Sequence, residues 1–442
     1  MAKRSGLSGF PEWLPEGRIV EQQILDSTRR IFELHGFGSL ETRSVEPVDV
    51  LLRKGEIDKE VYAVRRLHDE AATDADLALH FDLTVPFARY VVEHAGQLEF
   101  PYRRYQIQRV WRGERPQEGR FREFTQADID IIDAERLSPA HEAEIALVMA
   151  EVFASLPIPD AVIRVNNRKI LEGFYRGLGI DDPGAVLRAI DKLDKIGADK
   201  VRALLVGEAS LGPDIADQCL RLAEIRTPDL SFVDEVRSLG VDHPLLDEGL
   251  AELAAVVEAV NAARPGAILA DLHIARGLDY YTGTVYETFL DGFESFGSVC
   301  SGGRYDSLAS DGRTTYPGVG ISLGVTRLVS LLLGRGLVQV SRSVPSAVLI
   351  AVVDEGSRSA SDHVAQALRD RGIPCEVAPR ADKFGKQIRH AERRGIPFVW
   401  FPDVAGHTVK DIRSGEQVPA DPDTWQPPQD DLRPQVTRGD NT

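Results

Sequence analysis

A polar strand hairpin between residues 102 and 132 constrains the fold of this chain more than any other feature. Residues 105–111 and 121–132 have the composition of β-strands, with a long loop between them. A strand that faces a hydrophobic core does not carry many polar groups on that face. Because side chains alternate between the two faces of a strand, one face of the second strand carries Arg120, Arg122, Phe124, Gln126, Asp128 and Asp130. The pattern therefore predicts an antiparallel hairpin with one face directed at a ligand.

The charge of this hairpin is opposite to that of the chain as a whole. Residues 102–122 contain seven arginines and two glutamates, whereas the 442 residues together have a formal net charge of -17. A strongly acidic protein repels phosphate over most of its surface, so nucleic acid is expected only at a local basic site. Arginine suits such a site because its guanidinium group makes paired contacts with phosphate oxygens. A solvated basic loop is the alternative.

The bulk composition predicts more than one folded domain and a cytoplasmic protein. Of the 442 residues, 43% are hydrophobic, which is enough for two or three cores. No apolar run approaches the length of a membrane span, and the N-terminal sequence lacks the hydrophobic centre of a signal peptide. Cys219, Cys300 and Cys375 are isolated and lack the spacing of metal ligands. Neither a disulfide framework nor a structural zinc site is expected.

Hydrophobic periodicity predicts an α+β fold. Helical spacing recurs at residues 19–35, 85–94 and 140–153, and strand-like alternation at residues 61–67 and 77–83. The chain is expected to divide into a first domain at residues 1–335, with a helical insertion at about 168–262, and a second domain at residues 344–425. Strands and helices alternate in the second domain, as is typical of a small α/β sheet. The Pro-, Asp- and Gln-rich end, residues 426–442, is expected to be disordered.

Two further segments suit a small charged ligand. Residues Arg276–Gly283 combine a cation, a carboxylate and two tyrosines between glycines, although an ordinary strand with a buried tyrosine is the alternative there. Residues Gly318–Gly324 lead into a helix that carries Arg327. The chain has no catalytic triad pattern, no HExxH sequence and no P-loop. Attack of a carboxylate on the α-phosphorus of ATP needs none of these, because arginines and Mg²⁺ stabilise the charge that develops on phosphate.

Together these segments resemble the histidyl-tRNA synthetase family of class II aminoacyl-tRNA synthetases over roughly residues 19–417. The resemblance rests on Arg112-Gly113-Glu114 with Phe124 (motif 2), Gly318–Arg327 (motif 3), Arg276–Gly283 (the histidine-specific segment), Asp82–Phe87 and Val165–Leu171. It implies an antiparallel-sheet catalytic domain and a C-terminal α/β anticodon-binding domain. It also implies ATP-dependent ligation of L-histidine to tRNA(His) through a histidyl-adenylate.

The same resemblance implies a role for individual residues. The ATP-binding residues would be Arg112 and Glu114, Phe124 stacked on adenine, and Arg327 at the γ-phosphate with help from Arg120. The histidine-binding residues would be Asp82, Thr84 and Gln126 at the α-ammonium group, Asp130 and the Tyr281 hydroxyl around the imidazole, and also Tyr280. Arg112 and Arg276 would be catalytic, since Arg276 would contact both the substrate carboxylate and the α-phosphate.

The resemblance further implies the partners. Arg115 and Gln117 in the motif 2 loop would contact the tRNA acceptor end, and the basic helix at residues 383–394 is the candidate anticodon surface. Mg²⁺ is expected with ATP, with ligands that the sequence does not identify. The family is homodimeric, and no membrane association is expected.

Three positions depart from the family pattern, and two other functions compete with it. Motif 1 usually has a proline before its strand, whereas Pro47 is displaced here; motif 3 usually has Glu before its arginine, whereas Thr326 stands here; and residues 402–407 look shortened. The competing functions are a regulatory subunit of ATP phosphoribosyltransferase, which typically lacks the C-terminal domain, and a catalytically dead tRNA-binding sensor. The retained residues 347–417 and the unbroken Arg276–Tyr281 favour the enzyme.

Overall fold

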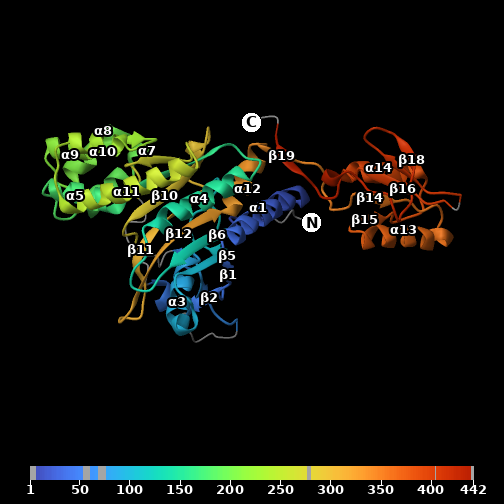
Figure 1. Cartoon of the computed structure of the whole chain (residues 1–442), viewed down its shortest axis with the longest axis horizontal. Helices are drawn as coiled ribbons and strands as arrows, with labels where there is room; N and C mark the ends of the chain where they lie inside the picture. The colour runs from blue at the N-terminus through green and yellow to red at the C-terminus, as the bar shows by residue number, and fades with distance from the viewer. Residues whose placement is uncertain (1–5, 53–59, 68–75, 276–279, 404, 440–442) are drawn as a thin grey trace. The chain divides into compact units, whose positions relative to one another are not determined.

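The computed structural model describes residues 6–52, 60–67, 76–275, 280–403 and 405–439. It divides into two compact units, one formed by residues 1–11 and 24–331 and the other by residues 12–23 and 332–442. Each unit is built around its own sheet (Figure 1). No helix among these residues is both long enough and apolar enough to cross a membrane.

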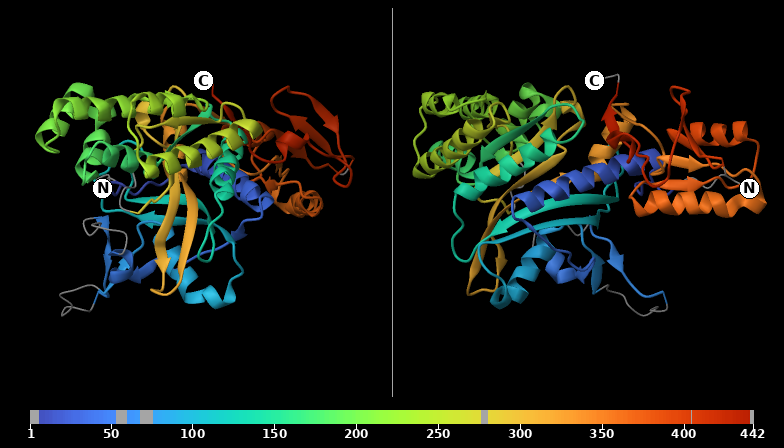
Figure 2. Two further views of the ribbon diagram at one scale, coloured as in Figure 1. Left: turned by 60° about the vertical axis from the view of Figure 1, so that its left-hand side comes forward. Right: turned by 45° about the vertical axis from the view of Figure 1, so that its right-hand side comes forward.

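A mixed, mainly antiparallel sheet forms the centre of the first unit. Among the described residues it has nine strands in the order β1-β5-β6-β12-β11-β10-β7-β9-β8. The pairs β1–β5 and β7–β9 are parallel, and the other neighbouring pairs of these strands, including β9–β8, are antiparallel. The strands are β1 (Gly38–Ser39), β5 (Tyr102–Trp111), β6 (Glu123–Ile132), β7 (Ala161–Asn167), β8 (Arg226–Thr227), β9 (Ile268–Asp271), β10 (Thr284–Leu290), β11 (Cys300–Ser310) and β12 (Thr315–Gly324). Figure 2 shows β11 and β12 as a long hairpin.

The predicted hairpin is confirmed as β5 and β6, and its two faces differ as the sequence indicates. Ile129 and Ile131 are fully buried, while Asp128 and Asp130 lie on the alternate face. Helix α4 (Ala140–Ala154) packs against β6, β12 and β7 and buries Ile145 among its apolar side chains. The polar face of β6 is thus available to form a site.

Helices and a small sheet complete the first unit. The small sheet has the order β2-β4-β3, and α5–α11 form the helical insertion coloured green in Figure 1. The small-sheet strands are β2 (Val45–Pro47), β3 (Ala63–Val64) and β4 (Leu77–Leu79); the helices are α1 (Pro15–Leu34), α2 (Val48–Leu51), α3 (Thr84–His94), α5 (Arg168–Gly177), α6 (Gly184–Ile190), α7 (Leu193–Ile196), α8 (Ala198–Gly207), α9 (Pro213–Glu224), α10 (Ser231–Ser238), α11 (Pro244–Ala263) and α12 (Val325–Gly334). Helices α1 and α12 each cross the boundary between the units.

The second unit contains a five-stranded sheet of order β15-β14-β16-β17-β18. The first three strands are parallel, and β17 and β18 are antiparallel, so the expected α/β alternation is present. Its elements are β13 (Val338–Val340), β14 (Val348–Ile350), α13 (Arg358–Asp370), β15 (Cys375–Val377), α14 (Phe384–Arg394), β16 (Phe398–Phe401), β17 (Thr408–Asp411), β18 (Gln417–Pro419) and β19 (Val436–Arg438).

The expectation of a disordered end is wrong for residues 426–439. Strand β19 pairs with β13, and Val436 is buried at 7% exposure. The sequence composition misled here because three specific anchors hold the segment. Besides the β13 pairing, Trp425 packs against Phe398 and Trp400, and Arg413 bonds Asp431 through two contacts of 2.8 Å.

The three cysteines lie in buried or half-buried positions. Cys219 and Cys300 are buried, Cys375 is half-buried, and all three are free. Burial raises the pKa of Cys219 to about 12, so its thiol stays protonated and unreactive.

Candidate active site

Two adjoining cavities lie over the polar face of β6. The larger has a volume of about 300 Å³ and the smaller about 80 Å³. Both are lined by Arg112, Gln126, Ser301 and Ser322, so the two cavities meet at these side chains. A ligand with two parts can therefore occupy both cavities at once.

Cross-strand register builds the floor of this site. Gln106 on β5 pairs with Asp128 on β6, which pairs with Ser322 on β12. Ser322 pairs with Ser301 on β11, which in turn pairs with Glu287 on β10. Because residues opposite one another in register point to the same face, five strands contribute one continuous polar row.

The larger cavity is lined by all five residues predicted to bind ATP. Arg112, Glu114, Arg120, Phe124 and Arg327 all line it. The Arg112 guanidinium lies 5.1 Å from the centre of the Phe124 ring and donates from Nε to the carbonyl oxygen of Phe81 at 3.0 Å. These contacts hold the cation at the junction of the two cavities. Arg120 is 3.3 Å from Glu114, so one acidic and one basic group meet at the rim.

The smaller cavity is lined by the described residues predicted to bind histidine. Asp82, Thr84, Gln126, Asp130, Tyr280 and Tyr281 all line it. Asp82 is buried at the start of α3, where it accepts from the backbone N–H of Val85 at 3.1 Å. The tyrosine rings lie 4.1 Å apart, and burial raises the pKa of Tyr280, which keeps its hydroxyl a hydrogen-bond donor.

Arg276 lies outside the described residues, as do Gly277, Leu278 and Asp279. Their predicted roles rest on the sequence alone. Both flanks of this segment are described, and the C-terminal flank is strongly anchored. The backbone N–H of Thr282 donates to the Arg304 carbonyl at 2.9 Å, and Arg168 N–H donates to the Gly283 carbonyl at 2.8 Å.

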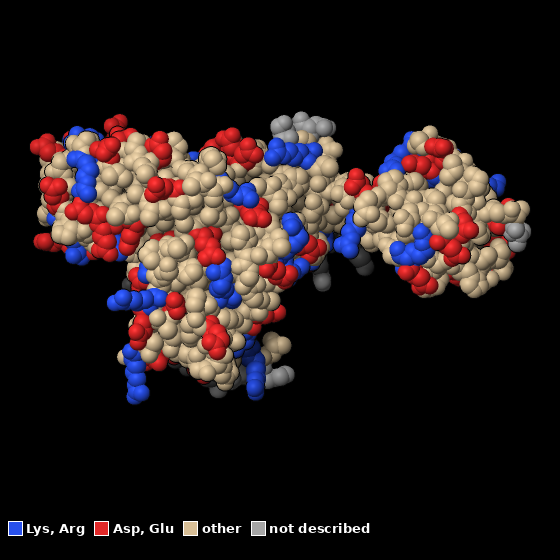
Figure 3. All heavy atoms as spheres, viewed as in Figure 1, with Lys and Arg blue, Asp and Glu red and all other residues tan. Residues whose placement is uncertain are grey.

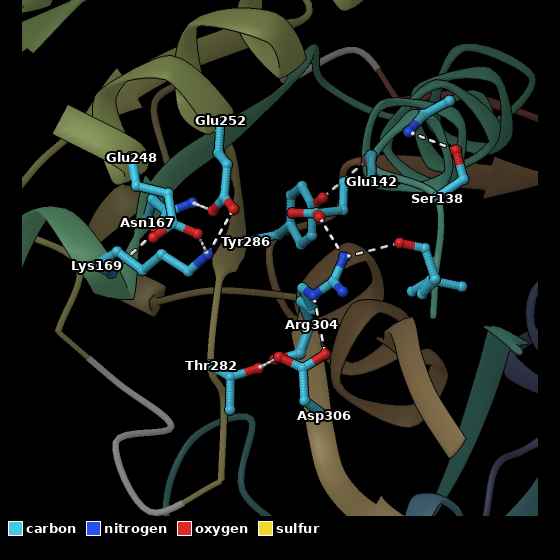
Figure 4. Close-up of polar contacts among 12 residues, drawn as sticks. Ser138, Glu142, Asn167, Lys169, Glu248, Glu252, Thr282, Tyr286, Arg304 and Asp306 are labelled. Atoms are coloured by element: carbon cyan, nitrogen blue, oxygen red, sulfur yellow. Dashed lines mark hydrogen bonds and ion pairs between the residues drawn. The ribbon is translucent and has the colours of Figure 1, made fainter. Parts of the chain in front are cut away.

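A ladder of polar contacts extends this anchor away from the cavity (Figure 4). The Thr282 hydroxyl donates to Asp306 at 2.5 Å, and Asp306 accepts from Arg304 Nε at 3.0 Å. Arg304 also donates to the buried Glu142 at 2.9 Å. On the other side of β10, Lys169 lies 2.5 Å from Glu248 and 2.6 Å from Glu252, which ties α5 to α11. Figure 4 shows both groups of contacts flanking Tyr286 on β10.

The two buried carboxylates of β6 have different partners. Asp130 is 2.6 Å from the fully buried Arg104 and accepts from the Tyr305 hydroxyl at 2.7 Å. Asp128 is also buried, but its Oδ1 atom has no hydrogen-bond partner among the described residues. Burial raises the pKa of Asp128 to about 7. Asp130 is therefore paired with a buried cation, while the pKa of Asp128 lies near neutral pH.

Glycines in β12 make room for these side chains. A Cβ atom at Gly320 would lie 2.0 Å from Asp130 Oδ1, and one at Gly318 would lie 2.5 Å from the Tyr305 ring. Neither Tyr305 nor Asp128 was assigned a binding role from the sequence, although both line the smaller cavity. The alternation of β6 places Asp128 on the ligand-directed face, whereas the position of Tyr305 depends on the pairing of β11 with β12.

The arginine-rich hairpin is less exposed than its composition suggests. Arg104 is buried in its ion pair with Asp130, and Arg103 bonds Glu144 at 2.5 Å. Arg109 also bonds Glu123, at 2.8 Å, but its side chain is exposed. Arg115 and Gln117 are exposed in the loop, as a contact with a large partner requires. Strand alternation predicts Arg122 on the same face as the site residues. It instead donates to the Glu114 carbonyl at 3.2 Å and does not line either cavity.

The second unit has a cavity of its own. Its volume is about 1050 Å³, and its lining includes Val353, Phe384, Phe401, His407 and Lys410. Phe384 is 42% exposed and packs edge-on against Phe401, with ring centres 5.0 Å apart. The cavity thus offers exposed aromatic surface beside polar groups, which suits unstacked bases.

Comparison with known proteins finds matching family models, named relatives and a similar solved structure. Residues 9–328 match the family described as histidyl-tRNA synthetase, and residues 347–419 match the anticodon-binding domain. Two relatives named histidine–tRNA ligase, from Micrococcus luteus and Cutibacterium acnes, are 60% and 61% identical, each over 99% of both chains. The crystal structure of histidyl-tRNA synthetase from Nostoc sp. PCC 7120 is similar with a TM-score of 0.86 and 35% identity, over 95% of this chain and 97% of that one.

Proposed function

Since this chain belongs to the histidyl-tRNA synthetase family, we propose that its two joined cavities form the histidyl-adenylate site. The chain ligates L-histidine to tRNA(His) with ATP as a substrate. The observation that carries the site assignment is that the predicted ATP residues line one cavity and the predicted histidine residues line the other. The regulatory-subunit alternative is not favoured, because the relatives named as ligases match the chain along its whole length.

In the first step, a histidine carboxylate oxygen attacks the α-phosphorus of ATP. A new P–O bond forms, the bond to the leaving pyrophosphate breaks, and histidyl-adenylate results. Arg112 is proposed to stabilise the charge on the α-phosphate from the junction of the cavities, with Arg276 at the substrate carboxylate. The protein contributes orientation and fixed positive charge rather than a nucleophile.

Recognition of the histidine side chain is proposed to depend on Asp130, Tyr281 and Tyr305. Asp130 pairs with Arg104 and accepts from the Tyr305 hydroxyl, and its carboxylate can also accept the imidazole N–H. The Tyr281 hydroxyl can donate to the other ring nitrogen. A site built this way rejects isosteres that lack these nitrogens, because its buried polar groups would be left without partners.

Mg²⁺ is proposed to accompany ATP. Glu114 and Glu287 line the larger cavity, and Mg²⁺ is commonly held by one or two carboxylates together with substrate phosphates. No group of three or more potential metal ligands is found within the described part of the chain, which fits a metal that shares its ligands with the nucleotide. When bound, the ion would neutralise charge on the phosphates.

The second step transfers histidine to a ribose hydroxyl at the tRNA 3′ end, with release of AMP. Arg115 and Gln117 are exposed and are proposed to contact the acceptor end. The anticodon is proposed to bind the second unit, at the cavity that contains Phe384 and Phe401 and along the basic surface of α14. Lys383, Lys386, Arg389 and Arg393 are all exposed there.

A cytoplasmic homodimer is proposed for the assembled protein. Exposed leucines on the first unit, Leu34 at 67% and Leu77 at 46%, support an apolar contact with a second copy. Light scattering after size exclusion tests this, since a monomer at micromolar concentration would contradict it.

Histidine-dependent exchange of pyrophosphate into ATP, followed by charging of tRNA(His), tests the proposed site. Single substitutions of Arg112 and Asp130 by Ala are expected to lower exchange at least about a hundredfold, or roughly 3 kcal/mol. Folded variants with an unchanged rate would refute the assignment.

A further inference from the structure

The turn between β10 and β11 contacts the arginine proposed to meet the ATP γ-phosphate. Phe296 lies in this turn, and its carbonyl oxygen accepts from Arg327 Nη2 at 2.5 Å. The Arg327 guanidinium lies 5.0 Å from the centre of the Phe296 ring. One residue therefore holds the cation both by a hydrogen bond and by a cation–π contact.

Two glycines with positive φ make this contact possible. At Gly297, with φ of 85°, a Cβ atom would lie 2.8 Å from Arg327 Nη2. At Gly119, with φ of 70°, a Cβ atom would lie 2.3 Å from the Phe296 ring. Phe296 is thus packed between the loop that follows Arg112 and the start of α12. Any side chain at either glycine would be strained and would displace the ring or the guanidinium.

The residue before Arg327 anchors the helix rather than the guanidinium. This residue is Thr326. Thr326 is buried, and its hydroxyl oxygen accepts from the backbone N–H of Thr125 at 2.8 Å. It fastens α12 to β6 and has no carboxylate with which to orient the neighbouring guanidinium.

We propose that Phe296 is the positioning residue for Arg327, and that it sets the preference of this enzyme for a nucleotide with a γ-phosphate. The proposal rests on the proposed role of Arg327 in ATP binding. Phe296 offers the guanidinium a neutral acceptor, its own carbonyl oxygen, and an aromatic face. Neither of these contacts neutralises the positive charge that Arg327 would present to phosphate.

The test compares Phe296→Ala with Phe296→Tyr in the full-length protein. Calorimetry without histidine would give the affinities for ATP, ADP and AMP, and pyrophosphate exchange would give the KM values for ATP and histidine. Phe296→Ala is expected to weaken ATP binding about tenfold. This is the size of effect expected when one cation–π contact is lost and the guanidinium is no longer held in one orientation. AMP binding and the KM for histidine should stay within about twofold of wild type, and Phe296→Tyr should resemble wild type.

Three further variants sharpen the comparison. Gly119→Ala displaces the ring from the opposite side and should reproduce the selective loss of ATP affinity, which keeps the test valid if Phe296→Ala folds poorly. Phe289→Ala removes a phenylalanine that packs 4.3 Å from a different arginine, Arg164, and should leave all three affinities unchanged. The double variant of Phe296→Ala and Arg327→Ala should bind ATP no more weakly than Arg327→Ala alone.

The outcomes separate this proposal from the one on which it rests. Equal weakening of ATP, ADP and AMP by Phe296→Ala would show that the turn is only a wall of the cavity and would overturn the positioning role. The positioning role also fails if Phe296→Ala binds ATP normally while Arg327→Ala does not. If Arg327→Ala leaves the preference for ATP over AMP intact, the proposed role of Arg327 itself fails.

Discussion

At the scale of single residues, the site depends on two neighbouring aspartates that differ in environment rather than in chemistry. Asp130 pairs with the buried Arg104, whereas burial raises the pKa of Asp128 to about 7. Both side chains lie on the same face of β6 and line the same cavity. Their difference arises from cross-strand neighbours, because Asp130 is paired in register with Arg104 and Asp128 with Gln106.

The raised pKa of Asp128 predicts a pH-dependent stability. An acid whose pKa is higher in the folded than in the unfolded state binds more protons when folded, so its contribution falls as pH rises from about 4 to about 7. Asparagine cannot ionise, so Asp128→Asn removes the fall in folding stability that accompanies ionisation of this buried carboxyl group. The variant should therefore gain stability over wild type across that interval, by up to a few kcal/mol, and the gain should level off above pH 7.

Thermal unfolding of wild type and Asp128→Asn between pH 5 and pH 8.5 provides the measurement. Asp311→Asn is a matched control, because Asp311 is exposed and its pKa is lowered by backbone hydrogen bonds from Thr314 and Arg313. A stability difference for Asp128→Asn that does not change with pH would contradict the prediction.

At the scale of elements, the glycines of strand β12 are explained by side chains that other strands place against it. The glycines at 318 and 320 are required because Tyr305 and Asp130 occupy the space above them. The sequence places β12 and its helix correctly, and the structure supplies the reason for the glycines.

Gly320→Ala is predicted to impair histidine binding. The added methyl group would lie 2.0 Å from Asp130 Oδ1 and 3.0 Å from the Ile129 carbonyl, so the carboxylate must move. The KM for histidine in pyrophosphate exchange should rise at least about tenfold. Gly334→Ala, at the end of α12 with no atom within 4 Å of the added carbon, is the control and should be neutral. An unchanged KM for Gly320→Ala would show that Asp130 does not contact the ligand.

The chain of polar contacts from Thr282 through Asp306 and Arg304 to Glu142 predicts a second effect on histidine binding. Thr282→Val keeps the shape of the side chain but removes the hydroxyl that donates to Asp306. A hydrogen bond to a charged group contributes about 1.5–3 kcal/mol, so the KM for histidine should rise about tenfold with little change in the KM for ATP. Thr282→Ser keeps the hydroxyl and should recover most of the loss. Equal effects of both substitutions would indicate a packing role instead.

At the scale of the whole molecule, charge is distributed unevenly among the parts. Residues 168–262 contain 18 acidic and 11 basic side chains, and acidic side chains are prominent over the helical insertion on the face drawn in Figure 3. Such a surface disfavours close RNA contact over most of its area. The regions proposed to bind tRNA are instead the exposed motif 2 loop and α14.

The ordered C-terminal segment leads to a prediction for the second unit. Removal of residues 426–442 deletes strand β19. It also deletes Asp431, which accepts two hydrogen bonds from Arg413. The truncated protein should unfold at a lower temperature and charge tRNA more slowly, while histidine-dependent pyrophosphate exchange stays within about twofold of wild type. Arg433→Ala in the full chain is the control, since Arg433 is exposed and β19 is retained. Equal loss of exchange and charging would contradict this separation.

The sequence by itself determined which residues belong to most of the helices and strands, which face of β6 is polar and which family the chain joins. These are local or family-wide signals: alternation along a strand fixes its two faces, and the motif residues identify the chemistry. The tertiary structure alone decided that Arg104 is a buried partner of Asp130 and that Phe296 supports Arg327. It also decided that residues 426–439 are ordered by β13, Arg413 and the packing of Trp425. Each of these depends on pairing between segments far apart in the chain, and the free energy of such contacts comes from burial and geometry that no local pattern encodes.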